Sequence, residues 1–140
     1  MGKLDDVSYH TGAEDFPEDA PEENGATHIG TFLTWALRKG LFTGTDAPAK
    51  AVDAVRKGSL SGRAFLLEHC NGKLLSEVFT PAGAAFAVEQ YSAYIEDYER
   101  LLGKQPEYQY LVEDNQTNYE IMAESLDRHW AAFQTTGKGR

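Results

Sequence analysis

The amino-acid sequence predicts a mainly α fold, a single compact domain of about four to five helices with at most a small β element. Three observations support this expectation. The chain has 140 residues, which is a typical length for one domain and enough to bury a core without disulfides. Apolar residues recur at helical spacings of three and four in several segments. Glycine, proline and capping residues separate these segments from one another.

The first 27 residues are predicted to form an acidic N-terminal arm, which packs on the domain or extends from it. A short strand is expected around Val7 to His10. Pro17 and Pro21 disfavour helix at the residues that precede them, so the acidic part of the arm is expected to be extended. The helical domain then covers residues 28–134, and the tail, residues 135–140, is expected to be disordered.

The first helix is predicted to begin near Ile29 and to end at Gly40, with Leu41 folding back on its last turn. A shorter helix over residues 47–57 is broken by Gly58. The apolar stripe of the first helix consists of Ile29, Phe32, Leu33, Ala36, Leu37 and Leu41.

Three further helices complete the predicted domain. Ser61 can cap the segment GRAFLLEHC, which Asn71-Gly72 ends. Thr80-Pro81 is a good start signal for a long helix that runs to about Leu102. Its apolar stripe consists of Ala84, Ala87, Tyr91, Tyr94, Ile95, Tyr98 and Leu102.

The last helix is expected to be capped by Asp114, after a short strand in the segment EYQYLV. Its apolar face consists of Tyr119, Met122, Leu126, Trp130 and Phe133. One core is then expected to contain Ile29, Phe32, Leu33, Leu37, Tyr98, Leu126 and Trp130.

The negative charge of the chain is concentrated near its N-terminus. The formal net charge is −9, and residues 1–27 hold eight acidic residues against one base, Lys3, a net charge of −7. The acidity disfavours direct binding of nucleic acid or of an anionic membrane surface. It fits a basic protein partner, or simply solubility.

The expected compartment is the cytoplasm. The N-terminus MGKLDDVSYH has no apolar signal region, and no stretch approaches the ~20 apolar residues of a membrane span. The single cysteine, Cys70, excludes an internal disulfide.

No motif in the sequence indicates catalysis, a cofactor or a metal. Phe16, Pro17 and Pro21 interrupt the acidic residues, so their spacing does not fit a calcium loop. Cys70 lies at the end of a predicted helix, where the partial negative charge raises a thiol pKa. A single cysteine with scattered histidines lacks the paired spacing of a zinc site. The sequence therefore predicts a protein that is not an enzyme, and His28 and Trp35 are assigned to packing.

Four segments occur in an order that resembles a family of small acidic bacterial proteins of unknown function. They are LDDVSYHTG, DFPEDAPEENGATHIGTFLTWA, FLLEHCNGKL and YLVEDNQTNY. Asn71-Gly72-Lys73 departs from the pattern, in which Asp-Gly-Lys is more common. The resemblance implies a bacterial cytoplasmic protein of the immunity type, which neutralises a toxin of a polymorphic toxin system by binding it.

The expected function is therefore to bind a basic protein partner, such as a cognate toxin, through the acidic arm. Phe16 is expected to act as an apolar anchor within the interface. The alternative is a cytoplasmic housekeeping or structural module with no toxin partner. The residues predicted to bind the partner are Glu14, Asp15, Phe16, Glu18, Asp19, Glu22 and Glu23.

Overall fold

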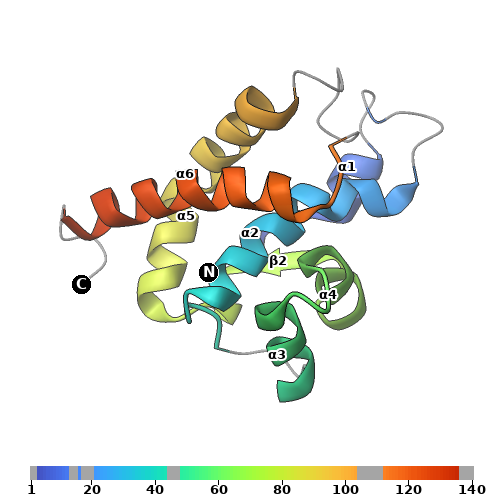
Figure 1. The fold of residues 1–140 in the computed structure, drawn as a ribbon, viewed down its shortest axis with the longest axis horizontal. Coiled ribbons are helices and arrows are strands. Elements are labelled where there is room, and N and C mark those ends of the chain that lie inside the picture. Colours follow the sequence, from blue (N-terminus) through green and yellow to red (C-terminus); the bar gives the residue numbers. More distant parts are fainter. Residues whose placement is uncertain (1–2, 13–15, 17–20, 44–47, 104–111, 136–140) are drawn as a thin grey trace.

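One helix, α2 (Thr27–Arg38), lies at the centre of the molecule (Figure 1). The computed structural model describes residues 3–12, 16, 21–43, 48–103 and 112–135. The other helices are α1 (Val7–Thr11), α3 (Ala49–Lys57), α4 (Gly62–His69), α5 (Pro81–Tyr98) and α6 (Gln116–Thr135). The strands are β1 (Lys3–Asp6) and β2 (Lys73–Leu75), and short helical turns are η1 (Glu22–Ala26), η2 (Ser76–Val78) and η3 (Glu99–Gly103). The predicted mainly α fold with a small β element is confirmed.

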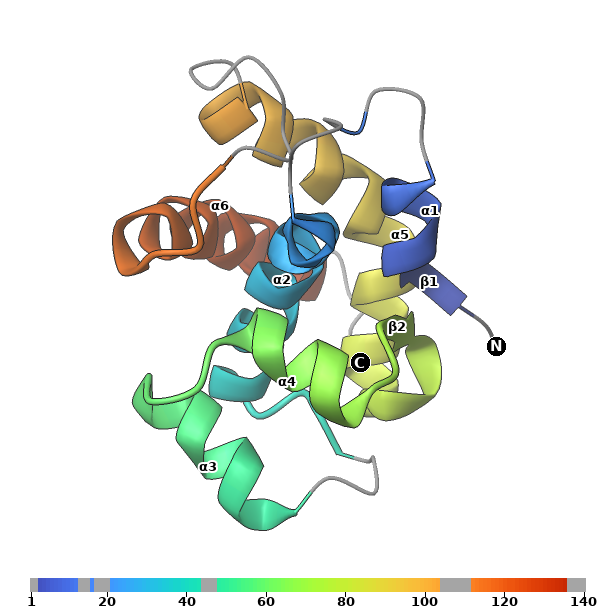
Figure 2. The ribbon, with the colours of Figure 1, turned by 90° about the vertical axis from the view of Figure 1, so that its right-hand side faces the viewer.

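Helix α2 is buried along almost its whole length. Every residue from Thr27 to Leu37 is buried, and α3, α4, α5 and α6 all contact this helix. In Figure 2, α6 lies on one side of α2, α5 on the other and α4 below it. A helix that is covered all round has no solvent-facing side, so its polar residues must find partners inside the protein.

Helices α2 and α4 cross where each of them has a glycine. A Cβ atom added at Gly30 would collide with the backbone of Arg63, and one added at Gly62 would collide with the carbonyl of Gly30. The two backbones can approach this closely because neither glycine has a side chain. This contact sets the short distance between α2 and α4.

The predicted boundaries of the first helix are confirmed. Gly40 has φ +75°, and its amide donates to the carbonyl of Leu37 at 3.2 Å, while that of Leu41 donates to the carbonyl of Ala36 at 2.9 Å. A glycine in the left-handed region is the usual way to end a helix.

The predicted caps of the next helices are also confirmed. The Ser61 hydroxyl accepts from the amide of Ala64 at 3.0 Å, and the Thr80 hydroxyl accepts from the amide of Gly83 at 3.0 Å. These bonds satisfy amides that a first helical turn otherwise leaves without partners.

The strand predicted around Val7 to His10 is wrong, because these residues form helix α1. Asp6 caps this helix, since its Oδ1 atom accepts from the amide of Ser8 at 2.9 Å. The strand is instead β1, which precedes α1 and pairs antiparallel with β2, with Lys3 opposite Leu75 and Asp6 opposite Lys73. Strand β2 is too short for its alternation to be recognised in the sequence.

The last helix is capped by Asn115 rather than by Asp114. The Asn115 Oδ1 atom accepts from the amide of Asn118 at 2.8 Å, whereas Asp114 forms an ion pair with Arg63 at 3.5 Å. Of the strand predicted in EYQYLV, only Val112 belongs to the described residues, and it is buried. The predicted tail also lies outside them, apart from Thr135, the last residue of α6.

All seven residues predicted to share one core do so. Six of them are buried, and Trp130 is half-buried against the same cluster. Its indole lies 6.2 Å from that of Trp35 and 5.2 Å from the Phe86 ring, measured between centroids. The aromatic faces of α2, α5 and α6 therefore meet in one cluster.

Replacing Leu33 by alanine tests the central position of α2. Leu33 is fully buried, so we expect this change to lower the free energy of unfolding by ~2–5 kcal/mol in denaturant titrations. The matched control is Leu67→Ala, because Leu67 is 38% exposed and its truncation leaves no closed cavity. Equal losses in the two variants would contradict the burial of α2.

Candidate functional site

Four polar side chains from four elements meet in the interior of the protein. Asp5 comes from β1, His10 from α1, His28 from α2 and Tyr91 from α5. Asp5 and His28 are 5% and 1% exposed, and the side chain of His10 is 17% exposed. This group is hereafter called the Asp–His cluster.

The Asp5 carboxylate is the hub of the Asp–His cluster. Its Oδ1 atom lies 2.7 Å from Nε2 of His10 and accepts from the amide of Asp6 at 2.8 Å. Its Oδ2 atom lies 3.1 Å from Nε2 of His28 and accepts from the Tyr91 hydroxyl at 2.7 Å. The two imidazole Nε2 atoms lie 3.1 Å from each other.

The local sequence positions Asp5 and His10 on the same side of the chain. Asp6 ends β1 and caps α1, so the chain changes from strand to helix between the two residues. The amide of Val7 also donates to the carbonyl of Gly72 at 2.9 Å, which holds this turn against the loop before β2. His28 reaches the same point from α2, one residue after the start of that helix.

The environment of Asp5 favours its ionised form. Burial by itself would raise the pKa of this carboxyl, but hydrogen bonds from His10, His28 and Tyr91 outweigh burial and hold the pKa well below its usual range. Asp5 is therefore a buried carboxylate that carries its charge at neutral pH.

The environment of His28 favours the neutral imidazole. Burial lowers its pKa, and His10 lowers it further, against an opposing contribution from Asp5. The Tyr94 hydroxyl donates to the backbone carbonyl of His28 at 2.5 Å, which fixes the start of α2 against α5. Burial also raises the pKa of Tyr91 well above its usual value, so its hydroxyl keeps the proton that it donates to Asp5.

The Asp–His cluster offers two imidazole nitrogens and a carboxylate, which are the donor atoms of many transition-metal sites. It is the one group of three such side chains in the described part of the chain whose donor atoms all lie within 4.8 Å of one another. This group could not be recognised in the sequence, because its histidines lie five and 23 residues from Asp5 and follow no local motif. The available signal was His28 itself, a polar residue on the apolar face of the first helix.

The residues predicted to bind a partner do not join the Asp–His cluster. Glu22 and Glu23 are exposed in the first turn of η1, and Phe16 is half-buried. The four other predicted residues, Glu14, Asp15, Glu18 and Asp19, lie outside the described residues.

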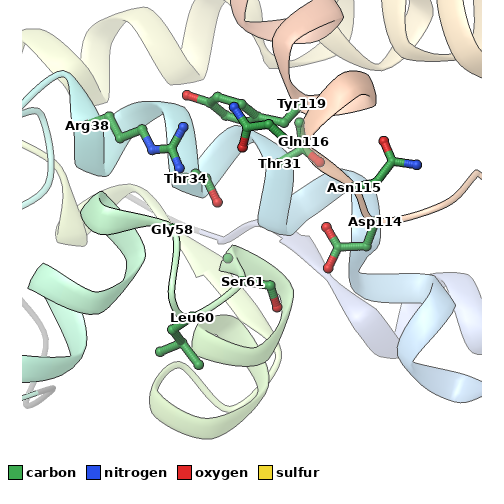
Figure 3. Close-up of a pocket in the computed structure, with 11 residues that line it drawn as sticks. Thr31, Thr34, Arg38, Gly58, Leu60, Ser61, Asp114, Asn115, Gln116 and Tyr119 are labelled. Atoms are coloured by element: carbon green, nitrogen blue, oxygen red, sulfur yellow. The ribbon is translucent and has the colours of Figure 1, made fainter.

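A pocket of about 200 Å³ lies between α2, the loop after α3 and the first turn of α6 (Figure 3). The Arg38 guanidinium lies 4.5 Å from the centre of the Tyr119 ring. The Thr34 hydroxyl donates to a carbonyl of its own helix at 2.7 Å, and Asp114 pairs with Arg63. These side chains have partners within the protein, so the pocket is a weaker candidate than the Asp–His cluster.

The sequence profile of a domain of unknown function (DUF7832) matches residues 3–112. The chain belongs to this family. The match includes Asp5, His10, His28 and Tyr91, and also the whole acidic arm from Lys3 onward. No match was found among curated proteins or among solved structures.

The described helices include none with both the length and the apolar character needed to cross a membrane.

The reactivity of Cys70 tests its expected structural role. Burial raises the pKa of the Cys70 thiol to about 11, so at pH 7.5 we expect alkylation roughly 100-fold slower than for an exposed cysteine, because the thiolate is the reactive form. Iodoacetamide labelling followed by mass spectrometry measures this rate, and the same chain in urea is the control. Labelling of the folded chain at the rate of the unfolded chain would reopen the catalytic interpretation.

Replacing Asp5 by asparagine tests the charge of the Asp–His cluster. Because the pKa of Asp5 is lower in the folded than in the unfolded chain, its carboxylate stabilises the fold above pH ~4, and this contribution falls as the pH drops further. We expect Asp5→Asn to lower the free energy of unfolding at pH 7 by roughly 1–3 kcal/mol. The difference from the parent chain should narrow below pH ~4. Denaturant titrations at several pH values measure this difference in the free energy of unfolding. The control is Glu96→Gln, because Glu96 is exposed. A difference that does not change with pH would contradict the ionised state of Asp5.

Proposed function

We propose that the chain is a binding protein that recognises a basic protein partner through its acidic N-terminal segment, as an immunity protein recognises its toxin. The observation that carries the proposal is the concentration of charge in residues 1–27, a net charge of −7 within a chain of −9. Such a concentration of carboxylates attracts a positively charged surface and speeds its association.

Two of the eight acidic residues in residues 1–27 are excluded from the proposed interface. Asp5 and Asp6 are buried; Asp5 belongs to the Asp–His cluster, and Asp6 pairs with Lys3 at 2.9 Å. They are therefore assigned to the fold. The acidic residues assigned to partner binding are the six that follow in the sequence, Glu14, Asp15, Glu18, Asp19, Glu22 and Glu23.

The proposal is supported by how the two ends of this acidic stretch are held. Helix α1, which precedes it, contacts η1, whose first turn holds its last two acidic residues. A Cβ atom at Gly25 would lie 3.2 Å from the Thr11 side chain and 3.4 Å from that of His10. The described residues on the two sides of the acidic stretch therefore lie next to each other, and Glu22 and Glu23 are exposed there.

Two aromatic side chains of the N-terminal segment suit an interface. Phe16 lies within the acidic stretch, and the Tyr9 ring on α1 is 58% exposed, with the Lys3 ammonium 4.8 Å from its centre. Interfaces gain most of their affinity from a few such anchors, whereas charges at the rim mainly set the rate of association. The proposal assigns binding rather than catalysis to this surface.

Neutralising the acidic stretch tests the proposal. The variant changes Glu14 and Glu18 to Gln and Asp15 and Asp19 to Asn. We expect its association with the basic partner, isolated from the source bacterium by affinity capture, to slow by roughly tenfold or more at low salt. Raised salt should slow the parent chain in the same way, because it screens the same attraction. Stopped-flow or surface-binding kinetics at several salt concentrations measure both effects.

The matched control has the same change in net charge at another place. It converts four exposed glutamates of α4, α5 and η3 to Gln, namely Glu68, Glu89, Glu96 and Glu99. We expect this control to associate at nearly the rate of the parent chain. Equal rates for the two variants, or rates independent of salt, would contradict binding through the acidic segment.

A further inference from the structure

We propose that Asp5, His10 and His28 form a binding site for one divalent first-row transition-metal ion. The proposal is independent of partner binding by the acidic segment. Its basis is the convergence of donor atoms in the interior: Nε2 of His10 lies 2.7 Å from Oδ1 of Asp5, Nε2 of His28 lies 3.1 Å from Oδ2 of Asp5, and the two Nε2 atoms lie 3.1 Å from each other.

Hydrogen bonds alone do not account for the three short contacts within the Asp–His cluster. Each Nε2 atom can carry one hydrogen at most. If both carry one, both can donate to Asp5, but the two N–H groups then face each other at a nitrogen separation of 3.1 Å. If only one carries a hydrogen, the other nitrogen presents its lone pair to the carboxylate. A bound cation removes this conflict, because it accepts a lone pair from all three donor atoms.

The separations of the donor atoms also fit a shared ion. Imidazole and carboxylate ligands bind transition metals at ~2.0–2.2 Å, and two ligand atoms at that distance and ~3 Å apart subtend ~90° at the ion. Three ligands at such angles occupy one face of the coordination sphere and leave other positions for water or another ligand. Two imidazole nitrogens favour zinc, iron, cobalt or nickel over magnesium or calcium, which prefer oxygen.

Contacts around the Asp–His cluster hold the ligands in place. The Tyr91 hydroxyl and the Asp6 amide each donate to a different oxygen of Asp5, which fixes the plane of the carboxylate. Hydrogen bonds of this kind orient metal ligands and strengthen binding. An ion could reach the site beside His10, whose side chain is the most exposed of the three ligands.

A second histidine–carboxylate contact in the chain provides a comparison. On α5 and α6, Nε2 of His129 lies 2.8 Å from Oδ2 of Asp97, and the side chain of His129 is 38% exposed. This pair is not part of a group of three donors in the described residues. It is therefore a matched control for a histidine that contacts a carboxylate without belonging to the proposed site.

Titration of the metal-free chain with Zn²⁺ tests the proposal. The full chain, stripped with a chelator and carrying Cys70→Ala to remove the thiol, is titrated by calorimetry. We expect one Zn²⁺ ion per chain, and a melting temperature that rises with Zn²⁺ concentration because the ion binds the folded state. Titration with Co²⁺ should produce the visible absorption of a site with nitrogen and oxygen ligands.

Variants then assign the ion to the Asp–His cluster. We expect His10→Gln to weaken Zn²⁺ binding by at least ~100-fold, and Tyr91→Phe, which removes a hydrogen bond to a ligand, by ~10–100-fold. His129→Gln should bind Zn²⁺ as the parent chain does. Circular dichroism confirms that each variant is folded, and His10 is chosen over the fully buried His28 to limit the effect on folding.

NMR of the chain with all its histidines intact identifies the ligands even if a variant fails to fold. The chain has four histidines, and their ring signals can be followed by NMR during the Zn²⁺ titration. We expect the signals of His10 and His28 to shift until one equivalent is added, and those of His69 and His129 to stay unchanged. The proposal is overturned if neither Zn²⁺ nor Co²⁺ binds with a dissociation constant below about 100 μM. It is also overturned if the His10→Gln and His129→Gln variants bind Zn²⁺ with equal affinity, or if only the NMR signals of His69 and His129 shift.

Discussion

The burial of a histidine in the central helix is the constraint on which much of the structure depends. Helix α2 is covered on all sides, so each of its polar side chains needs a partner inside the protein. Thr31 and Thr34 have hydrogen-bond partners within the helix, because their hydroxyls donate to carbonyls one turn earlier at 3.0 and 2.7 Å. The Nε2 atom of His28 instead finds partners in another part of the chain, Asp5 on β1 and His10 on α1.

This requirement explains why the N-terminal residues fold onto the helical domain. A buried carboxylate is costly unless it is hydrogen-bonded, and Asp5 contacts His10 on α1 and His28 on α2 and accepts from the Tyr91 hydroxyl and the Asp6 amide. Strand β1 must therefore lie beside α5 and pair with β2. In consequence, the acidic segment is not a free N-terminal end. It follows α1, and its last two acidic residues, Glu22 and Glu23, belong to η1, which contacts both α1 and α2.

Most of the helices could be predicted from the sequence, because helix signals are local. Apolar spacing located α2 and α6, and Gly40, Ser61 and Thr80 marked the helix ends where the structure has them. The Asp–His cluster could not be predicted in the same way, since its members are brought together by tertiary packing. Counting charges along the chain also grouped Asp5 with the other acidic residues of the N-terminal arm, although its side chain is buried and belongs to the fold. A polar residue on an otherwise apolar helical face remains the one sequence feature that pointed to the cluster.

The chemistry of the Asp–His cluster follows from the number of hydrogens that it can hold. Asp5 is ionised and His28 is neutral, as their environments favour, and a neutral imidazole with its hydrogen on Nδ1 directs the lone pair of Nε2 at the other donor atoms of the cluster. Charge alone does not select an ion, because the ionised Asp5 carboxylate attracts any cation. The proposed choice of a transition metal rests on geometry, since the short distances among the imidazole nitrogens and the carboxylate oxygens suit ligands of one such ion. An ion there would join β1, α1 and α2 directly, and so would hold together the same elements that bring the acidic segment back to the domain.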